Sequence, residues 1–218
     1  IYGCLVGSEM CIRDSLTKIN FYKYGFFGSV SKSFIDSKLD VSIGVRADED
    51  SFSTGSKIVD NLSPRISTSY SISKDRRLSW NSSIGTYFKI PTYTVLGFKN
   101  LTGEFINRSA KYTKSSHYVT GFDYSIGNAA KVSIEGFVKR YANFPISLID
   151  GVSLANKGAD FEVLGNEAVL TNGEGKTKGI EFLFQQKLTR NFYGIFSYTF
   201  FKSEFTDING NYLPSVWD

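Results

Sequence analysis

Hydrophobic and polar residues alternate along most of this chain with a period of two. In residues 39–46 (LDVSIGVR), every second residue is apolar, and the residues between them are small, polar or charged. The same alternation recurs at residues 62–73, 78–89, 118–126, 132–139, 180–188 and 192–200, and a less regular stretch spans about residues 18–31. Because successive side chains of a strand point to opposite faces of its sheet, the pattern predicts about eight strands of roughly 10–14 residues and no helix.

The connections between these stretches alternate between short and long. The short ones lie around Asp36 and at residues 73–77, 127–130 and 189–191, whereas the long ones begin at Glu49, Ile90 and Ala142. Long loops without structure are rare in compact soluble domains. Short periplasmic turns that alternate with long outer loops are typical of outer-membrane barrels. We therefore predict an all-β fold, a partial transmembrane antiparallel β-barrel.

Aromatic residues support this prediction moderately, because they lie near the expected strand ends. Tyr70 and Trp80 flank the short turn at residues 73–77, and Phe88, Tyr118 and Phe200 approach the outer ends. Aromatic girdles mark both interfaces of membrane barrels, although ordinary cross-strand pairing also brings aromatic residues together. In a barrel the apolar face points outward, so the inner face would be almost entirely small, polar or charged.

Composition excludes several other classes of protein. The chain is 41% hydrophobic and 21% charged, too apolar for a disordered chain. Its longest uncharged runs, residues 78–88 and 191–201, fall short of the ~18 residues that a membrane-spanning helix needs. The 19 Phe and 13 Tyr with a single Met favour strands over helices. The net charge of +4 is spread over the chain, so we expect no nucleic-acid partner.

The first 15 residues differ from the rest of the chain. They contain both cysteines, Cys4 and Cys11, and the only methionine, and the chain opens on Ile1. The string CLVGSEMCIRDS resembles translated sequencing-adapter sequence, so we interpret residues 1–15 as a non-native leader; a short unstructured natural leader is the alternative. Under either reading the cysteines form neither a disulfide nor a metal site. Residues 16–218 are then the barrel domain.

The direction of the strands indicates that the barrel is incomplete. If the short turns are periplasmic, the first strand descends from the outer surface and the last one returns to it. Complete bacterial barrels ordinarily keep both termini in the periplasm. We therefore expect a fragment of a larger barrel.

Several stretches resemble the TonB-dependent receptors of Gram-negative outer membranes, in the Bacteroidetes style. Residues 39–48 (LDVSIGVRAD) and 61–67 (NLSPRIS) resemble a strand that ends in Arg-x-Asp and a following Ser-Pro-Arg strand start. Further similarity lies in residues 78–91 (LSWNSSIGTYFKIP), 171–185 (TNGEGKTKGIEFLFQ), 193–205 (YGIFSYTFFKSEF) and 210–218 (GNYLPSVWD). Each motif is weak alone, but their order and spacing are jointly specific.

This resemblance implies a barrel of about 22 strands, of which this chain holds about eight, without the plug or the C-terminal strands. It further implies TonB-dependent uptake of a scarce siderophore, vitamin, peptide or glycan across the cell outer membrane, without enzymatic chemistry or a cofactor. The implied partners are outer-membrane lipid, the TonB complex through the missing plug, and a small-molecule or oligomeric nutrient. Two alternatives remain: another large barrel, such as a porin or channel, and a soluble β-sandwich that binds carbohydrate.

Three features suggest other chemistry, but each has a simpler explanation. Residues 173–177 (GEGKT) end like a phosphate-binding loop, yet Leu170 occupies the position of the first glycine that this motif requires. His117 follows Ser115 and Ser116, but it is the only histidine and a catalytic triad needs more partners. No His, Cys and Asp cluster has metal-site spacing, although calcium in an outer loop is an alternative. We predict no catalytic and no metal residues.

Ligand contacts are expected on the long outer loops, because recognition residues concentrate on loops held by a rigid scaffold. The candidates are aromatic side chains and one cation, with loop packing as the alternative role: Tyr93, Phe98, Arg108, Tyr141, Phe144 and Phe161.

Overall fold

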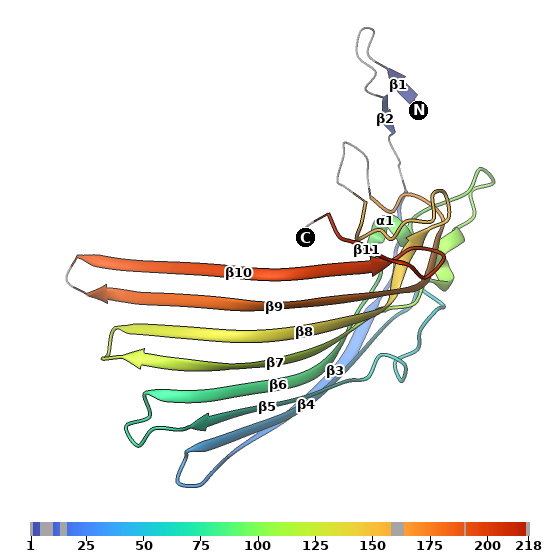
Figure 1. Cartoon of the computed structure of the whole chain (residues 1–218). Coiled ribbons are helices and arrows are strands. Elements are labelled where there is room, and N and C mark those ends of the chain that lie inside the picture. The colour runs from blue at the N-terminus through green and yellow to red at the C-terminus, as the bar shows by residue number, and fades with distance from the viewer. Residues whose placement is uncertain (1, 5–10, 14–16, 158–163, 190, 217–218) are drawn as a thin grey trace.

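The computed structural model describes residues 2–4, 11–13, 17–157, 164–189 and 191–216. Most of them belong to one antiparallel sheet of nine strands, in which every strand pairs with its neighbours in sequence (Figure 1). In chain order the strands are β3 (Lys23–Phe34), β4 (Leu39–Asp50), β5 (Ser63–Ser71), β6 (Leu78–Lys89), β7 (Thr113–Ile126), β8 (Ala130–Ser147), β9 (Val169–Thr189), β10 (Phe192–Thr206) and β11 (Tyr212–Pro214). The sheet is curved and open: β3 and β11 form its two edges within the described residues.

A separate hairpin precedes this sheet. Strands β1 (Tyr2–Cys4) and β2 (Cys11–Arg13) pair with each other, and Cys4 lies opposite Cys11 in the register. The hairpin pairs with no strand of the large sheet. The interpretation of residues 1–15 as a non-native leader stays a prediction.

The predicted meander is confirmed, and the sheet is larger than the alternation indicated. β8 and β9 continue to Ser147 and Val169, beyond an irregularity between Tyr141 and Phe144. Here Gly173 and Gly175 interrupt the apolar period, so backbone pairing extends the strand without a sequence signal. The ninth strand, β11, has three residues, too few for a period of two to be visible.

The prediction of no helix is wrong for two single turns. Helix α1 (Tyr93–Leu96) and the 3-10 turn η1 (Ile106–Ser109) lie in the long connection between β6 and β7. Each has four residues, about one helical turn, so an amphipathic period of 3.6 cannot appear in the sequence. Among the described residues, no helix has the length and apolar character needed to cross a membrane.

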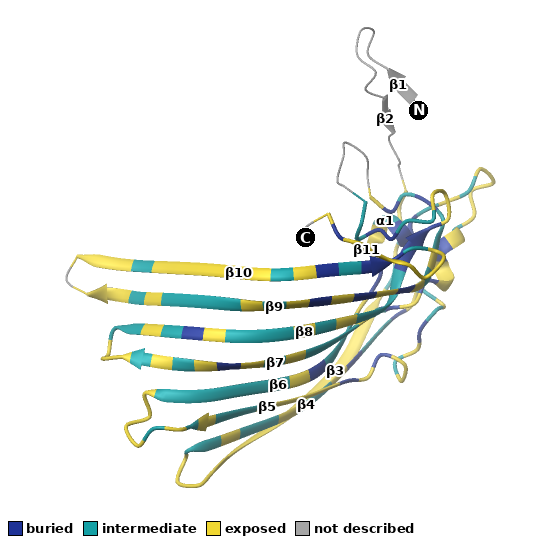
Figure 2. Cartoon of the chain, viewed as in Figure 1, coloured by how far each residue is buried: buried dark blue, intermediate teal, exposed yellow. Residues whose placement is uncertain are grey.

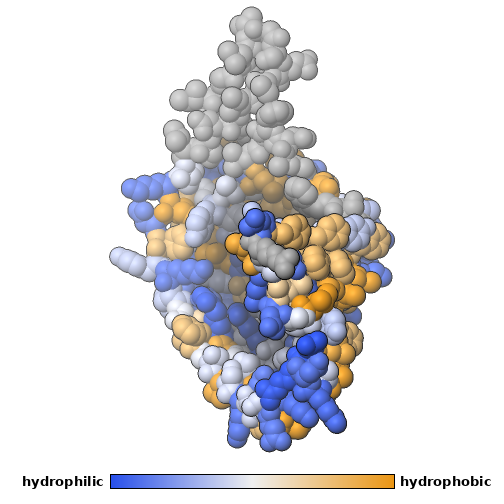
Figure 3. All heavy atoms as spheres, turned by 90° about the vertical axis from the view of Figure 1, so that its left-hand side faces the viewer, coloured by the Kyte–Doolittle hydropathy of each residue, from blue (hydrophilic) through white to orange (hydrophobic). Residues whose placement is uncertain are grey.

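The register separates an apolar face from a polar one. One row of neighbouring positions across β4 to β10 consists of Leu39, Tyr70, Trp80, Phe122, Ile134, Phe182 and Tyr198. The adjacent row consists of Asp40, Ser69, Asn81, Gly121, Glu135, Glu181 and Thr199. Seen from the short-turn end, hydrophobic residues lie on the outside of the curve and hydrophilic residues gather in its hollow (Figure 3). This arrangement fits a barrel wall and differs from a sandwich, which buries its apolar faces between two sheets.

The two ends of the sheet differ in their connections. Residues 35–38, 72–77 and 127–129 form short turns at one end, and residues 51–62, 90–112 and 148–168 form long loops at the other (Figure 1). Buried residues concentrate at the loop end (Figure 2). The long loops are therefore folded onto one another rather than extended into solvent.

Candidate functional site

A small hydrophobic core holds the long loops together. α1 contributes Val95 and Leu96, both fully buried, and Tyr112, just before β7, is buried beside them. The core also includes Ile90, Ala110 and Leu154. Because these residues come from two different long loops, the loops form one folded cap over the end of the sheet.

A buried carboxylate ties the first long loop to this cap. Asp50, the last residue of β4, accepts hydrogen bonds from the backbone N–H groups of Phe52 and Ser53 at 2.8 and 2.7 Å. The Tyr112 hydroxyl donates to Asp50 Oδ2 at 2.9 Å. Burial raises the pKa of Asp50, but the hydrogen bonds from Ser53, Phe52 and Tyr112 together outweigh it and hold the pKa below its usual value. For Tyr112, burial and the neighbouring carboxylate both raise the pKa of the hydroxyl.

Asn107 connects the second and third long loops. Its side-chain amide donates to the carbonyl oxygens of Val95 and Glu167 at 2.8 and 2.7 Å. Its Oδ1 accepts the backbone N–H of Val169 at 3.1 Å, at the start of β9. Sequence reasoning missed this residue, because nothing but an Asn-x-Ser triplet marked it.

A charged cluster braces the third long loop. Lys157 Nζ lies 2.9 Å from Asp150 and 2.8 Å from Glu167, and the Ser147 hydroxyl donates to Glu167. Burial lowers the pKa of Lys157, but the two carboxylates outweigh it and raise the pKa above its usual value. Asp150 is thus committed to an ion pair, and among the described residues no three His, Cys, Asp or Glu residues gather as a metal site would require.

The predicted ligand contacts of the second loop lie in or beside one aromatic group. Tyr93 is 59% exposed, and its ring meets Phe21 edge-on at 5.6 Å between centroids. Arg108 Nε donates to the Phe52 carbonyl at 3.1 Å, and its guanidinium lies 5.1 Å from the Phe52 ring centre. Phe98 is half-buried, and its N–H donates to the carbonyl of Val95 at 3.3 Å. Tyr93 therefore presents free surface, whereas the side chain of Arg108 is held against the first loop.

The candidates on β8 form a second aromatic group. Tyr141, Phe144 and Phe205 lie with ring centroids 4.7–6.3 Å apart. In the register Gly175 separates Tyr141 from Phe205, and a Cβ atom at Gly175 would lie 2.4 Å from the Phe205 ring. The missing side chain makes room for that ring. Phe161 lies outside the described residues.

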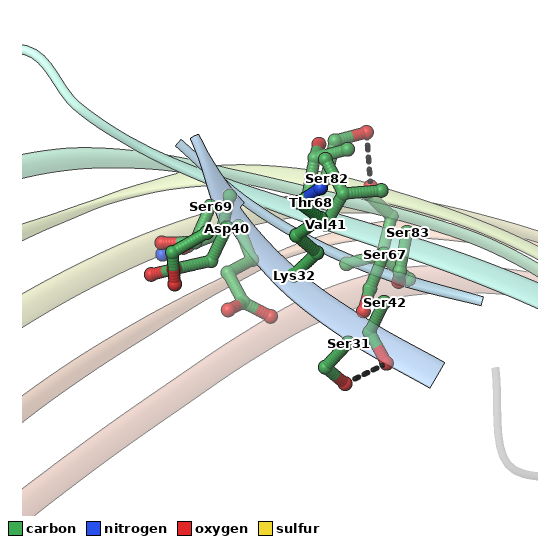
Figure 4. Close-up of a pocket in the computed structure, with 14 residues that line it drawn as sticks. Ser31, Lys32, Asp40, Val41, Ser42, Ser67, Thr68, Ser69, Ser82 and Ser83 are labelled. Atoms are coloured by element: carbon green, nitrogen blue, oxygen red, sulfur yellow. Dashed lines mark hydrogen bonds between the residues drawn. The ribbon is translucent and has the colours of Figure 1, made fainter. Parts of the chain in front are cut away.

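Serines dominate the inner face near β3. Ser31, Ser42, Ser67 and Ser83 occupy neighbouring positions on successive strands, and the hydroxyls of Ser31 and Ser42 are hydrogen-bonded at 2.9 Å. They line a groove of about 490 Å³ together with Ser69 and Asn81 (Figure 4). This part of the wall presents short hydroxyl and amide groups to whatever fills the lumen.

The expectation of an almost entirely polar inner face is wrong for β7 to β10. Val119, Phe137 and Phe201 occupy inner positions there, with Gly179 between the last two. A Cβ atom at Gly179 would lie 2.7 Å from the Phe137 ring, so the aromatic side chain covers the glycine. Aromatic residues thus occupy inner positions where a neighbouring strand provides a glycine.

The two motifs that suggested other chemistry have structural roles. Residues 173–177 lie inside β9 and lead into no helix, whereas a phosphate-binding loop opens one. The Ser115 hydroxyl and His117 Nε2 lie 2.7 Å apart on the inner face, and the His117 ring packs on Tyr87 at 4.6 Å. Among the described residues, no carboxylate is hydrogen-bonded to His117 to complete a triad.

Comparison with known proteins agrees with this geometry. Residues 5–216 match the family described as TonB dependent receptor-like, beta-barrel. No curated protein sequence matches the chain.

Three similar solved structures are outer-membrane proteins. The alcaligin receptor FauA from Bordetella pertussis has 16% identity and a TM-score of 0.56, over 89% of this chain and 32% of that one. The ferripyoverdine receptor of Pseudomonas aeruginosa has 14% identity and a TM-score of 0.60, over 88% and 24%. The transporter YddB from Escherichia coli has 16% identity and a TM-score of 0.59, over 89% and 26%. At these identities the likeness shows the fold, and the chain spans about a quarter to a third of each structure's length.

Proposed function

Because this chain belongs to the TonB-dependent receptor-like β-barrel family of the outer membrane, we propose that it forms part of the wall and outer mouth of an uptake receptor. The observation that carries this proposal is the two-faced sheet, apolar outside and largely polar inside, closed at one end by folded loops. An outer-membrane wall needs such a sheet, because lipid covers one face and a filled or aqueous lumen the other.

In this account the substrate is a scarce siderophore, vitamin, peptide or glycan. It arrives at the loop end, contacts the cap and enters the lumen when TonB acts on a plug that the described strands would surround. The family description and the siderophore receptors among the similar structures support this route. A diffusion porin, the main alternative, would let solutes pass without energy.

Uptake by living cells tests the proposal. Cells that produce the receptor and isogenic cells without it are given labelled ferric siderophores, cobalamin, peptides and oligosaccharides, one at a time, with and without a protonophore. We expect saturable, protonophore-sensitive accumulation of at least one compound only in the producing cells. Accumulation that is unselective and insensitive to the protonophore would support the porin instead.

We propose Tyr93 as the substrate contact to test first, since it combines an exposed aromatic ring with a position on the folded cap. Aromatic anchors often contribute most of the binding energy of an interface. We expect Tyr93→Ala to weaken binding of the transported compound about tenfold. Tyr24→Ala is the matched control, because Tyr24 is similarly exposed but lies on β3, opposite Glu49 and away from α1. Equal binding by both variants and the wild type would remove Tyr93 from the site.

A further inference from the structure

The outer face of β8, β9 and β10 changes abruptly from apolar to basic toward the loop end. Ile180 and Phe200 are neighbours across β9 and β10, and both are exposed. Two residues closer to the loops, Lys178 and Lys202 are neighbours at the equivalent positions. The next such row contains Arg140, Lys176 and Glu204. The cations thus lie just beyond the apolar surface that would contact hydrocarbon.

A groove runs along this boundary. It has a volume of about 650 Å³ and is centred on Gly136, which presents no side chain to it. A Cβ atom at Gly136 would meet no atom closer than 4.0 Å, so the groove is open at this point. Apolar side chains flank it, and Lys178 and Lys202 are its basic members; the flanking residues are Ile84, Tyr118, Val138, Ile180 and Phe200. We call this surface, with Arg140 and Lys176 beside it, the basic groove.

The basic groove carries more positive than negative charge. Glu204 pairs with both Lys176 and Lys202, at 3.0 and 2.9 Å. Lys176 Nζ also lies 4.0 Å from the centre of the Tyr212 ring, whose hydroxyl donates to Glu174 at 3.1 Å. Among the described residues, no carboxylate lies within ion-pair distance of Lys178 or Arg140. Four cations therefore face two carboxylates.

We propose that the basic groove binds a phosphorylated acyl-glycolipid of the outer leaflet. The acyl chain lies in the groove over Gly136, and the phosphate groups contact Lys178, Lys202 and Arg140. A soluble anion would gain nothing from an apolar groove on a lipid-facing surface, whereas an acylated phosphate fits both parts of it. The two rows of cations are about 7 Å apart along the strands, a spacing that suits a head group with more than one phosphate.

Lipid retention by the outer-membrane protein tests the proposal. The protein is purified in detergent, incubated separately with bisphosphorylated lipid A, phosphatidylglycerol or phosphatidylethanolamine, and examined by native mass spectrometry. We expect the wild type to retain lipid A in preference to both other lipids. Lys178→Gln with Lys202→Gln should weaken retention of lipid A roughly tenfold to thirtyfold, because each lysine near anionic lipid contributes to binding.

Two further variants separate charge from shape and from general damage. Gly136→Phe fills the groove without changing its charge, and it should also reduce retention of lipid A. Lys57→Gln with Lys111→Gln removes the same charge from exposed loop residues and should retain lipid A like the wild type.

Three results would overturn the proposal. Equal retention of phosphatidylethanolamine would show that phosphorylated head groups are not selected. Equal retention of phosphatidylglycerol would remove the assignment to a glycolipid. Undiminished retention by folded Gly136→Phe, or by the double lysine variant, would show that the lipid binds elsewhere.

Discussion

At the scale of single residues, Gly175 permits the aromatic group at the mouth of the inner face. Phe205 is buried against Tyr141 and Phe144, and its ring lies where a side chain at position 175 would stand. Such close approach to backbone requires a residue without Cβ. The packing of this group therefore depends on a residue that takes no direct part in it.

We predict that Gly175→Ala destabilises the protein by about 1–3 kcal/mol, because the added methyl group overpacks a filled site. Thermal unfolding monitored by circular dichroism measures the effect. Gly28→Ala is the control, since a Cβ atom there would meet nothing within 4 Å. In a Phe205→Ala background the cost of Gly175→Ala should largely disappear; an unchanged cost would contradict the proposed clash.

Asp50 gives the cap a specific dependence on pH. Its pKa is lowered in the folded protein, so its contribution to stability is present above the unfolded value of about 4 and is lost as the pH falls through the folded value. We predict that thermal stability drops less steeply below about pH 4 in Asp50→Asn than in the wild type. Tyr112→Phe, which removes one donor to Asp50, should give an intermediate profile. Identical profiles for all three proteins would contradict this role.

At the scale of elements, the strands could be predicted from the sequence and the cap could not. Alternation such as that of residues 39–46 is dictated by the two faces of a barrel wall, so β4 is visible in the sequence alone. The cap depends on contacts between distant segments, such as Asn107 with Val95 and Glu167. No local period encodes such contacts. For the same reason the predicted aromatic candidates were reasonable choices by type, while their packing partners were invisible.

The third long loop depends on one cation. Lys157 pairs with Asp150 and Glu167, and its removal leaves the largely buried Glu167 carboxylate without a counter-charge. We predict that Lys157→Met destabilises the local fold of residues 148–168 by about 1–3 kcal/mol and makes the loop more susceptible to protease. Lys111→Met, at an exposed loop position, should leave the rate of cleavage unchanged. Equal cleavage rates for both variants would show that the ion cluster does not hold the loop.

At the scale of the whole molecule, the account rests on which face of the sheet meets lipid. The apolar rows lie on the outside of the curve and the serine-rich rows on its inside (Figure 3). The uptake route, the aromatic mouth and the basic groove all assume this orientation. The similar structures extend well beyond the part that this chain matches, and their further strands would continue the same curve.

Nitroxide scanning of β10 tests that orientation most directly. Single cysteines replace residues 196–201 one at a time in a Cys4→Ser, Cys11→Ser background, and the labelled protein is reconstituted in liposomes. We predict high accessibility to oxygen dissolved in the bilayer at Phe196, Tyr198 and Phe200, and at Ser197, Thr199 and Phe201 higher accessibility to a water-soluble nickel complex than at those outward positions. Uniform accessibility, or the opposite phase, would contradict the placement of this sheet as a wall between lipid and lumen.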